Sequence, residues 1–476
     1  MVWIAAAMLV FIFQMATILL LEFRHPSKAV AWLFILLVFP LIGFIMYYFL
    51  ARDYRQRRKV RHKGVKVSEE TQVELYRRSA IVHRAADLRN NEMPRQQRLF
   101  NLLQNLPDAP ITSCNETVIL TDGEPTFASI MEAIEGARHH IHLEYYTIRK
   151  AGVGEQLRQA LLRKAKMGIE IRIIYDGLGS YELDESYFEP LRAAGVQIHC
   201  FLPPLFAFFD KRINFRNHRK IVVIDGEIGY LGGINIGDEY LGKHPKLGYW
   251  RDTHMRVKGD AVYYLQHTFL TDWSFVSGEK ITDLRYFPQH DCPGAEQVQI
   301  IASGPDTAWG TILEMYFGAL SVACERIYIT SPYFIPEPAI AMALKTAAVS
   351  GVDVRIIIPG ISDSKIVKWA SLSYVKELMQ AGVRFFEYQK GFIHAKIVII
   401  DRLLASVGTA NMDMRSFFSN FELNAVMFDE KTIDRIDRDF QEDLINSKEI
   451  ILSEFVRRPR LQRLREVLAR FLSPLL

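Results

Sequence analysis

The sequence is poor in cysteine and has no strong excess of either charge. Its four cysteines are Cys114, Cys200, Cys292 and Cys324 in a chain of 476 residues. They are too far apart for a C-x-x-C pair or a zinc-ligand spacing, so we expect free thiols rather than a metal site or a disulfide framework. Lysine and arginine number 58 against 54 aspartates and glutamates, a formal net charge of +4. Net charge therefore gives no reason to expect a general polyanion-binding protein.

Long apolar runs are absent after residue 50, but two occur before it. Val2–Leu21 is uncharged, and Gln14 and Thr17 are its only polar members. Twenty helical residues reach about 30 Å, the thickness of a bilayer's hydrocarbon core. Residues 29–50 form a second uncharged run. A cleaved signal peptide explains this pattern poorly, because no basic residue precedes the first run and a second run follows at once. We therefore expect a two-helix transmembrane hairpin over residues 1–50.

Basic residues follow the second run. Residues 52–63 contain seven lysines and arginines, which places the rest of the chain on the cytoplasmic side by the positive-inside rule. The same cluster would attract anionic lipid headgroups. Residues 51–112 are expected to form a basic juxtamembrane and helical linker. A second basic segment, residues 457–472, has the pattern of an amphipathic helix, which could lie on anionic lipid or pack on the soluble part of the protein.

The remainder of the chain contains an internal duplication. Residues 141–146 match 327–333, residues 168–177 match 351–360, and residues 194–199 match 381–386. Short β-branched runs alternate with helical patterns in both copies, which is typical of α/β proteins. We expect two related halves, residues 113–293 and 294–476, each a mixed β-sheet flanked by helices. The second half would end in the amphipathic helix.

The first half also carries an apolar, aromatic insertion at residues 201–210. It could enter the membrane interface, line the acyl chains of a substrate, or pack in the core.

Two copies of a His-x-Lys-x4-Asp motif, each followed by Gly-x-x-Asn, are the strongest functional signal. The copies supply, in order, His218, Lys220, Asp225 and Asn235, and then His394, Lys396, Asp401 and Asn411. On a strand, His and Lys at this spacing share one face. One imidazole could attack phosphorus while the other protonates the departing alkoxide, because imidazole titrates near neutral pH. The lysines and asparagine amides would hold the phosphate charge without a metal.

The carboxylates of the motif need a different explanation. Asp225 lies roughly 20 Å from His218 along an extended strand. We therefore expect Asp225 and Asp401 to brace the turn and strand, although they belong to the catalytic motif. As the carboxylate that orients each histidine we predict Glu422 for His394 and Asp252 for His218; a surface or structural role is the alternative for both. The small residues before each asparagine would let the backbone approach the substrate.

With both motifs intact, the sequence resembles the phospholipase D superfamily, in which two such motifs meet in one active site. The N-terminal hairpin, the basic stretch and residues 249–254 make it similar to bacterial cardiolipin synthases over essentially the whole chain. The resemblance implies condensation of two phosphatidylglycerol molecules into cardiolipin and glycerol through a phosphatidyl-histidine, at the bacterial cell membrane and without cofactor or metal. It also implies that His218 is the nucleophile and His394 the general acid, whereas the residues alone permit the reverse.

Other functions use the same motif. A phospholipase D-type hydrolase or another phosphatidyltransferase is the main alternative. A nuclease would need a basic, aromatic-lined groove in the soluble part, whereas the basic cluster here adjoins the membrane segments. A non-catalytic membrane scaffold would carry degenerate motifs. The expected partners are phosphatidylglycerol and anionic membrane lipids but no nucleic acid; the sequence does not specify the oligomeric state.

Overall fold

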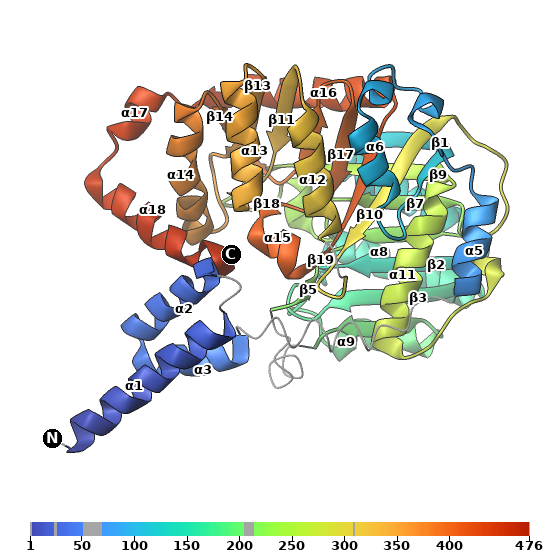
Figure 1. Ribbon diagram of the computed structural model, residues 1–476. Coiled ribbons are helices and arrows are strands. Elements are labelled where there is room, and N and C mark those ends of the chain that lie inside the picture. The colour runs from blue at the N-terminus through green and yellow to red at the C-terminus, as the bar shows by residue number, and fades with distance from the viewer. Residues whose placement is uncertain (1, 23–25, 51–68, 204–213, 308–309, 476) are drawn as a thin grey trace.

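The computed structural model describes residues 2–22, 26–50, 69–203, 214–307 and 310–475. The body of the protein is built on one continuous mixed sheet of sixteen strands, with helices packed on both faces (Figure 1). The strands before residue 260 are β1 (Ile111–Thr121), β2 (His140–Tyr145), β3 (Glu170–Asp176), β4 (Gln197–Phe201), β5 (Arg216–Asn217), β6 (Ile221–Ile224), β7 (Ile228–Gly232), β8 (Tyr249–Arg251) and β9 (Thr253–Gly259).

The strands of the second half follow the same succession. They are β10 (Glu296–Ser303), β11 (Arg326–Thr330), β12 (Phe334–Ile335), β13 (Asp353–Pro359), β14 (Arg384–Tyr388), β15 (Gly391–Ile393), β16 (Ile397–Ile400), β17 (Leu404–Gly408), β18 (Met412–Asp413), β19 (Asn420–Met427) and β20 (Ser447–Glu449). The short strands β12 and β18 pair with each other, and so do β8 and β15, outside the main sheet.

The strand order shows the duplication directly. From the centre outward the first half runs β1-β9-β7-β6-β2-β3-β4, and the second runs β10-β19-β17-β16-β11-β13-β14-β20. Strands β1 and β10 pair antiparallel where the halves meet. In each half three neighbouring strands are parallel, β2, β3 and β4 or β11, β13 and β14, and such pairs require crossover connections. The α/β class expected from the sequence is confirmed.

Helices cover both faces of the sheet. They are α5 (Glu69–Arg78), α6 (Gln97–Gln104), α7 (Gly123–Gly136), α8 (Val153–Lys166), α9 (Glu185–Ala193), α11 (Ala261–Ser277), α12 (Thr311–Val322), α13 (Pro338–Val349), α14 (Lys365–Gln380), α15 (Met414–Phe418), α16 (Glu430–Ile445), α17 (Leu452–Val456) and α18 (Arg460–Leu472). In β6, Ile221 and Val223 join the apolar cluster of α11, while Val222 and Ile224 join that of α7 and α8. Because β6 is buried on both faces, its sequence is an unbroken apolar run.

The N-terminal apolar segments form three helices that project from the body of the protein (Figure 1). Helix α1 (Val2–Leu21) is long and apolar enough to cross a membrane, and no other helix of the described residues meets that length. The second run is divided into α2 (Pro26–Val38) and α3 (Pro40–Leu50), the latter beginning at a proline, which suits a first helical turn. At about 1.5 Å per residue, neither α2 nor α3 reaches the roughly 30 Å of a bilayer core.

The division lets α3 fold back on α2. A Cβ at Gly43 would lie only 2.9 Å from the Ile35 carbonyl oxygen, so the glycine permits the close approach. The structure therefore has one apolar helix of membrane-spanning length and a pair of short apolar helices, not two continuous spans.

Helix α18 packs on the soluble part and also reaches the N-terminal helices. Its buried residues Glu466 and Ala469 lie on the side that contacts α14. The ring of Phe471 stacks on Phe34 of α2 at 5.5 Å, and the C-terminus lies beside α2 (Figure 1). Packing on the soluble part is thus observed, while Leu461 and Leu464 remain 59% and 53% exposed. Of the insertion at 201–210, Phe201 and Leu202 are buried, and residues 204–210 lie outside the described residues.

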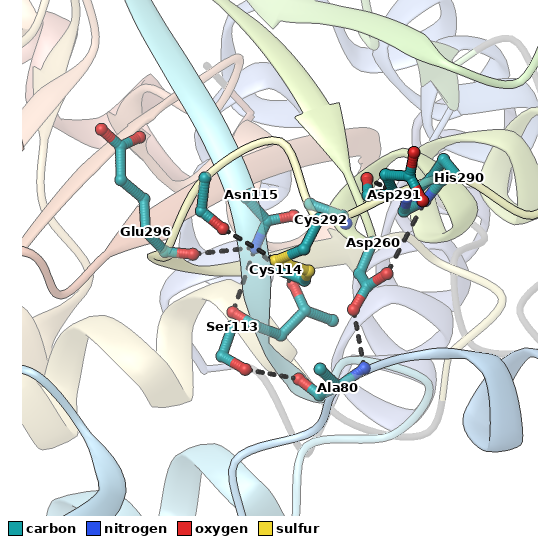
Figure 2. The surroundings of a disulfide bond; sticks show 12 residues. Ala80, Ser113, Cys114, Asn115, Asp260, His290, Asp291, Cys292 and Glu296 are labelled. Carbon is teal, nitrogen blue, oxygen red and sulfur yellow. Dashed lines mark hydrogen bonds and ion pairs between the residues drawn. A yellow bond between two sulfur atoms is a disulfide. The ribbon is translucent and has the colours of Figure 1, made fainter.

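Two of the expected free thiols are joined. Cys114 of β1 and Cys292 form a disulfide although they are 178 residues apart in the sequence (Figure 2). The antiparallel pairing of β1 with β10 brings them together, because Asn115 is the partner of Glu296 and the Cα atoms of the two cysteines lie 5.1 Å apart. Our prediction of free thiols was wrong for this pair and holds for Cys200 and Cys324.

Candidate active site

Both motifs open into one cavity of ≈ 300 Å³. We call it the two-histidine cavity. Side chains from both halves line it: Tyr146, Thr147, Arg216, His218, Asn235, Tyr240, Trp250, Tyr333, Ile335, Asp363, Val367, His394, Asn411, Asp413, Arg415 and Asn420. The duplicated motif therefore contributes to a single site and not to two separate ones.

The His-x-Lys segments occupy connections, not strands. His218 and Lys220 lie between β5 and β6, and His394 and Lys396 lie between β15 and β16. The apolar run that follows each lysine is the strand, as expected. The prediction that His and Lys lie on a strand was therefore wrong, because each strand begins one residue after the lysine.

Each histidine is paired with a carboxylate from the other half. Nδ1 of His218 lies 2.9 Å from Oε2 of Glu422, and Nδ1 of His394 lies 2.7 Å from Oδ2 of Asp252. Both carboxylates are fully buried. The sequence had suggested Glu422 and Asp252 as the orienting residues with the opposite assignment. Each does contact a histidine, but the predicted pairing was wrong.

Backbone pairing between the halves produces the crossed arrangement. Strand β5, just before His218, pairs in parallel with the start of β19, which carries Glu422. Strand β15, just before His394, pairs in the same way with β8, which ends immediately before Asp252. The His218 amide also donates to the carbonyl of Phe421, and the His394 amide to that of Arg251. Each motif is thus held, through backbone and side chain, by the half to which it does not belong.

The carboxylates fix the proton on each ring. An ionised carboxylate only accepts hydrogen bonds, so Nδ1 of each imidazole carries the hydrogen and Nε2 keeps its lone pair. Burial lowers the pKa of His218 to about 4 and that of His394 to about 3, against the opposing effect of the carboxylates. Burial acts to raise the pKa values of Asp252 and Glu422, but the neighbouring histidines hold them below their ordinary range. Both rings are therefore neutral near pH 7 before a substrate binds.

Two lysine charges are buried beside the histidines. Lys220 is fully buried and Lys396 is 2% exposed. Each ammonium donates to the carbonyl of the histidine two residues earlier, at 2.6 and 2.5 Å. Among the described residues, neither forms an ion pair with a carboxylate within 4.0 Å. Burial lowers the pKa of Lys220 well below its ordinary value, and the charge of Lys396 adds to this. Such a pair of cations is suited to an anionic group entering between them.

The two asparagines line the cavity in different ways. Oδ1 of Asn235 accepts from the Thr147 amide at 3.1 Å, and its Nδ2 donates to the Tyr240 hydroxyl at 3.0 Å. Oδ1 of Asn411 is buried without a hydrogen-bond partner among the described residues. Both side chains are therefore placed at the cavity, and contact with a phosphate remains our proposal for them.

The glycines before the asparagines make room for neighbouring protein side chains. A Cβ at Gly233 would lie 2.0 Å from Oδ1 of Asp252, and one at Gly408 would lie 2.2 Å from Oδ1 of Asn424. Gly233 is needed because the carboxylate that orients His394 occupies that space. The contacts thus give these glycines a packing role, and approach of the backbone to a substrate here stays a prediction.

The motif aspartates brace the chain, away from the cavity. Asp225 accepts hydrogen bonds from the backbone amides of Arg138, His139 and His140 at 2.8–2.9 Å, which ties the turn after β6 to the start of β2. Asp401 accepts from the amides of residues 324–326 in the same way. Both adopt a left-handed backbone conformation, with φ of 56° and 50°. The contacts agree with the bracing role predicted from the sequence.

Replacing Asp225 or Asp401 by alanine is expected to destabilise the fold without altering the chemistry. Three hydrogen bonds to a carboxylate are lost and three amides are left unpaired, a cost of about 2–4 kcal/mol. We expect a lower Tm in a thermal shift assay and near-normal turnover per folded molecule. Asp283→Ala, at an exposed aspartate that caps a single turn, is the control. An Asp225→Ala protein with unchanged Tm but lost turnover would contradict this role.

Several residues of the site were not predicted from the sequence. Thr409 donates to Oε2 of Glu422, and Asn420 donates to its Oε1 at 3.1 Å. Tyr146 packs edge-on against His218, and Trp250 lies 5.2 Å from His394 between ring centroids. Tyr146 and Thr409 belong to the repeated segments, so closer comparison of the two copies could have singled them out.

Comparison with solved structures establishes the fold class. The fold resembles phosphatidylserine synthase of Haemophilus influenzae Rd KW20, with a TM-score of 0.63 at 14% identity over 80% of this chain and 100% of that one. It also resembles polyphosphate kinase of Porphyromonas gingivalis, with a TM-score of 0.51 at 13% identity over 71% of this chain and 49% of that one. At these identities the likeness concerns the fold alone.

Sequence comparison narrows the class to one family. A family model described as "Cardiolipin synthase, PLD-like domain" matches residues 130–273 and 316–444, one segment in each half, and one described as "Phospholipase_D-nuclease N-terminal" matches residues 2–52. The cardiolipin synthase of Geobacillus kaustophilus (strain HTA426) is 44% identical over 97% of this chain and 91% of its own length. That of Alkalihalophilus pseudofirmus is 44% identical over 96% and 91%. The chain belongs to the cardiolipin synthase family of the phospholipase D superfamily, and this makes it a phosphatidyltransferase.

Proposed function

We propose that the protein transfers a phosphatidyl group from one phosphatidylglycerol to a second, giving cardiolipin and glycerol. The observation that carries this proposal is the pair of buried lysines, without carboxylate partners among the described residues, beside two histidines in one cavity. The cavity thus supplies positive charge for a phosphodiester and two imidazole Nε2 atoms for the chemistry. The division into residues 1–50, 51–112, 113–293 and 294–476 is part of the same proposal.

In the first step Nε2 of His218 attacks the phosphorus of the donor lipid. The P–N bond forms as the P–O bond to the headgroup glycerol breaks, and His394 gives a proton from its Nε2 to the departing oxygen. Because Nδ1 of His218 keeps its hydrogen, the phosphorylated ring becomes cationic, and the buried Glu422 stabilises that charge. His394 must first acquire its Nε2 proton, which the negative charge of a bound phosphate and the neighbouring Asp252 both favour.

In the second step a glycerol hydroxyl of another phosphatidylglycerol replaces the histidine. Its proton passes to Nε2 of His394, its oxygen bonds to phosphorus, and the P–N bond breaks, which restores His218. One phosphodiester is exchanged for another, so no nucleotide is needed to drive the reaction. A site that excludes water favours the lipid hydroxyl over hydrolysis.

The product formed from phosphatidylglycerol tests this function. Vesicles containing phosphatidylglycerol with a labelled acyl chain should yield labelled cardiolipin and one free glycerol per cardiolipin. Labelled phosphatidic acid as the sole product would overturn the synthase assignment in favour of a hydrolase.

The pH dependence of turnover should show the titration of Lys396. Burial lowers the pKa of this lysine to about 8, and the charge that binds phosphate is lost as the pH rises through that value. We expect kcat/KM for phosphatidylglycerol to fall above about pH 8, by up to about tenfold per pH unit. Lys396→Arg carries a permanent charge and should move this limb to higher pH. The exposed Lys376→Arg should leave it in place, and a limb that persists in Lys396→Arg would contradict the assignment.

We further propose that α1 spans the membrane, that α2 and α3 are embedded in it, and that α18 lies on its surface. Leu461, Leu464, Leu468 and Phe471 form an exposed apolar stripe at helical spacing, and each is at least 40% exposed. Arginines flank this stripe, and Phe471 meets α2, so the stripe continues the apolar surface of the N-terminal helices. A basic amphipathic helix of this kind is suited to anionic lipid.

Collisional quenching tests the position of α18. A fluorophore at Leu464→Cys, in a Cys200→Ser/Cys324→Ser background, should be quenched by lipids that carry a nitroxide on the acyl chain. The same fluorophore at Val349→Cys, another exposed apolar position, should not be quenched. Equal quenching at both positions would contradict the assignment.

The catalytic part is proposed to face the cytoplasm of a bacterial cell. The basic residues at 52–63 support this side, whereas the Cys114–Cys292 disulfide is unusual in a reducing compartment. The exposed Cys324 is a natural probe of the question. A membrane-impermeant maleimide should label it in permeabilised cells and leave it unlabelled in intact cells, and labelling in intact cells would place the site outside.

A further inference from the structure

Arg415 is a cation of the two-histidine cavity that the chemistry described above does not use. It lies on α15, four residues after Asn411, and lines the cavity. Its Nε donates to Oδ1 of Asn420 at 3.3 Å. Among the described residues no carboxylate lies within 4.0 Å of its guanidinium, whereas the other cavity arginine, Arg216, lies 3.4 Å from Asp176. The terminal nitrogens of Arg415 are thus available to an anion.

Arg415 lies on the His218 side of the cavity. Asn420, which anchors its Nε, donates from Nδ2 to Glu422 at 3.1 Å, and Glu422 holds His218. Burial raises the pKa of the Tyr146 hydroxyl, and the charge of Arg415 opposes that rise. The ring of Tyr146 lies 5.2 Å from that of His218. The guanidinium therefore stands near the reacting phosphate without belonging to either His-Lys pair.

The two carboxylates that line the cavity already accept hydrogen bonds from other groups. Asp363 accepts from the hydroxyl of Tyr333, and Asp413 caps α15 by accepting from the Ser416 amide at 2.6 Å. Neither forms an ion pair with Arg415 within the described part of the chain.

The repeat provides Arg415 in one half only. Counting four residues after the motif asparagine gives Arg415 in the second half and Glu239 in the first. Glu239 accepts from Nε of Arg149 at 2.8 Å and thereby neutralises a cation. The His-Lys pairs are duplicated, but this additional positive charge is not, so the cavity is electrostatically asymmetric.

We propose that Arg415 binds the phosphate of the acceptor lipid, an inference that rests on the proposed function. When one phospholipid attacks the phosphatidyl-histidine of another, two phosphates occupy the cavity, joined through the glycerol whose hydroxyl reacts. The lysines hold the reacting phosphate, and the planar guanidinium of Arg415 suits bidentate contact with the second. Water and simple alcohols carry no phosphate. Arg415 is thus a specificity residue that favours transfer to a phospholipid over hydrolysis or alcoholysis.

Competition between acceptors tests this assignment in the full-length protein. Vesicles of acyl-labelled phosphatidylglycerol are incubated with 1-butanol, and cardiolipin, phosphatidylbutanol and phosphatidic acid are quantified. Arg415→Gln should lower the ratio of cardiolipin to phosphatidylbutanol by about 10- to 100-fold, the range expected for lost hydrogen bonds to a charged group. Arg415→Lys should give an intermediate ratio. Arg438→Gln, the same change at an exposed position of α16, should keep the wild-type ratio.

The outcomes separate this inference from the proposed function. If Arg415→Gln loses both products equally, or loses neither, Arg415 does not select the acceptor, although wild-type cardiolipin synthesis would still stand. If the wild-type protein makes no cardiolipin, the proposed function fails, and this inference fails with it. Because Arg415→Lys keeps the charge, its intermediate ratio gives a reading of the site even where Arg415→Gln folds poorly.

Discussion

Replacing His218 or His394 by alanine is expected to lower phosphatidyl transfer by about 10³-fold or more. Each histidine contributes an Nε2 atom that the other cannot supply, because each is held by its own carboxylate at 2.7–2.9 Å in the same cavity. The measurement is cardiolipin formation from phosphatidylglycerol vesicles. His83→Ala, at an exposed histidine, is the matched control. Near wild-type turnover in either variant would contradict a shared two-histidine site.

The leaving group distinguishes the roles of the two histidines. In a phosphatidyl ester of p-nitrophenol the leaving group is p-nitrophenolate, which departs without protonation. Its departure therefore does not need a general acid. We expect His394→Ala to release a burst of about one p-nitrophenol per active site, because attack by His218 on this substrate no longer needs the acid, and then to turn over slowly, because the second step also uses His394. His218→Ala should give no burst. The opposite result would show that His394 is the nucleophile, a possibility that the residues of the motif left open.

The second large effect is expected from the buried carboxylates. Glu422→Gln and Asp252→Asn should each lower transfer by about 10²–10⁴-fold, because an amide no longer fixes the required tautomer or stabilises a cationic ring. Glu387→Gln is the control at a partly exposed carboxylate outside the cavity. A loss of less than about tenfold in Glu422→Gln and Asp252→Asn would mean that these contacts do not serve the chemistry.

The p-nitrophenyl substrate also tests the crossed pairing. If Asp252 serves the general acid His394, the activated leaving group should rescue the burst of p-nitrophenol in Asp252→Asn and fail to rescue it in Glu422→Gln. The assignment predicted from the sequence requires the reverse. Rescue of Glu422→Gln alone would therefore contradict the pairing seen between the halves.

Local pattern was sufficient to predict the buried strands after each motif and to select the candidate residues of the site. The apolar runs 221–224 and 397–400 are the buried strands β6 and β16, because a strand covered on both faces must be apolar throughout. The repeated His, Lys, Asp and Asn are informative because chance rarely places four such residues at the same spacings twice. The distance between Asp225 and His218 along an extended chain also predicted a bracing role for the aspartate, with which its contacts to backbone amides agree.

Contacts between segments far apart in the sequence could not be predicted from local sequence patterns. The pairing of β5 with β19 and of β15 with β8 assigns Glu422 to His218 and Asp252 to His394, and nothing near either histidine specifies it. The disulfide depends in the same way on β1 meeting β10. The second apolar run divides at Pro40, and Gly43 permits the close approach of α3 to Ile35 of α2. Composition alone was also compatible with one continuous helix.

The sequence by itself therefore determined the α/β class, the duplication, the membrane-spanning length of α1 and the histidines and asparagines that line one cavity. It could do so because side-chain periodicity and a repeated motif are local properties of the chain. Only the tertiary structure decided which carboxylate serves which histidine, where the cysteines pair, and that Arg415 enters the shared cavity. These features arise from strand pairing and packing between residues far apart in the sequence, which no local pattern encodes.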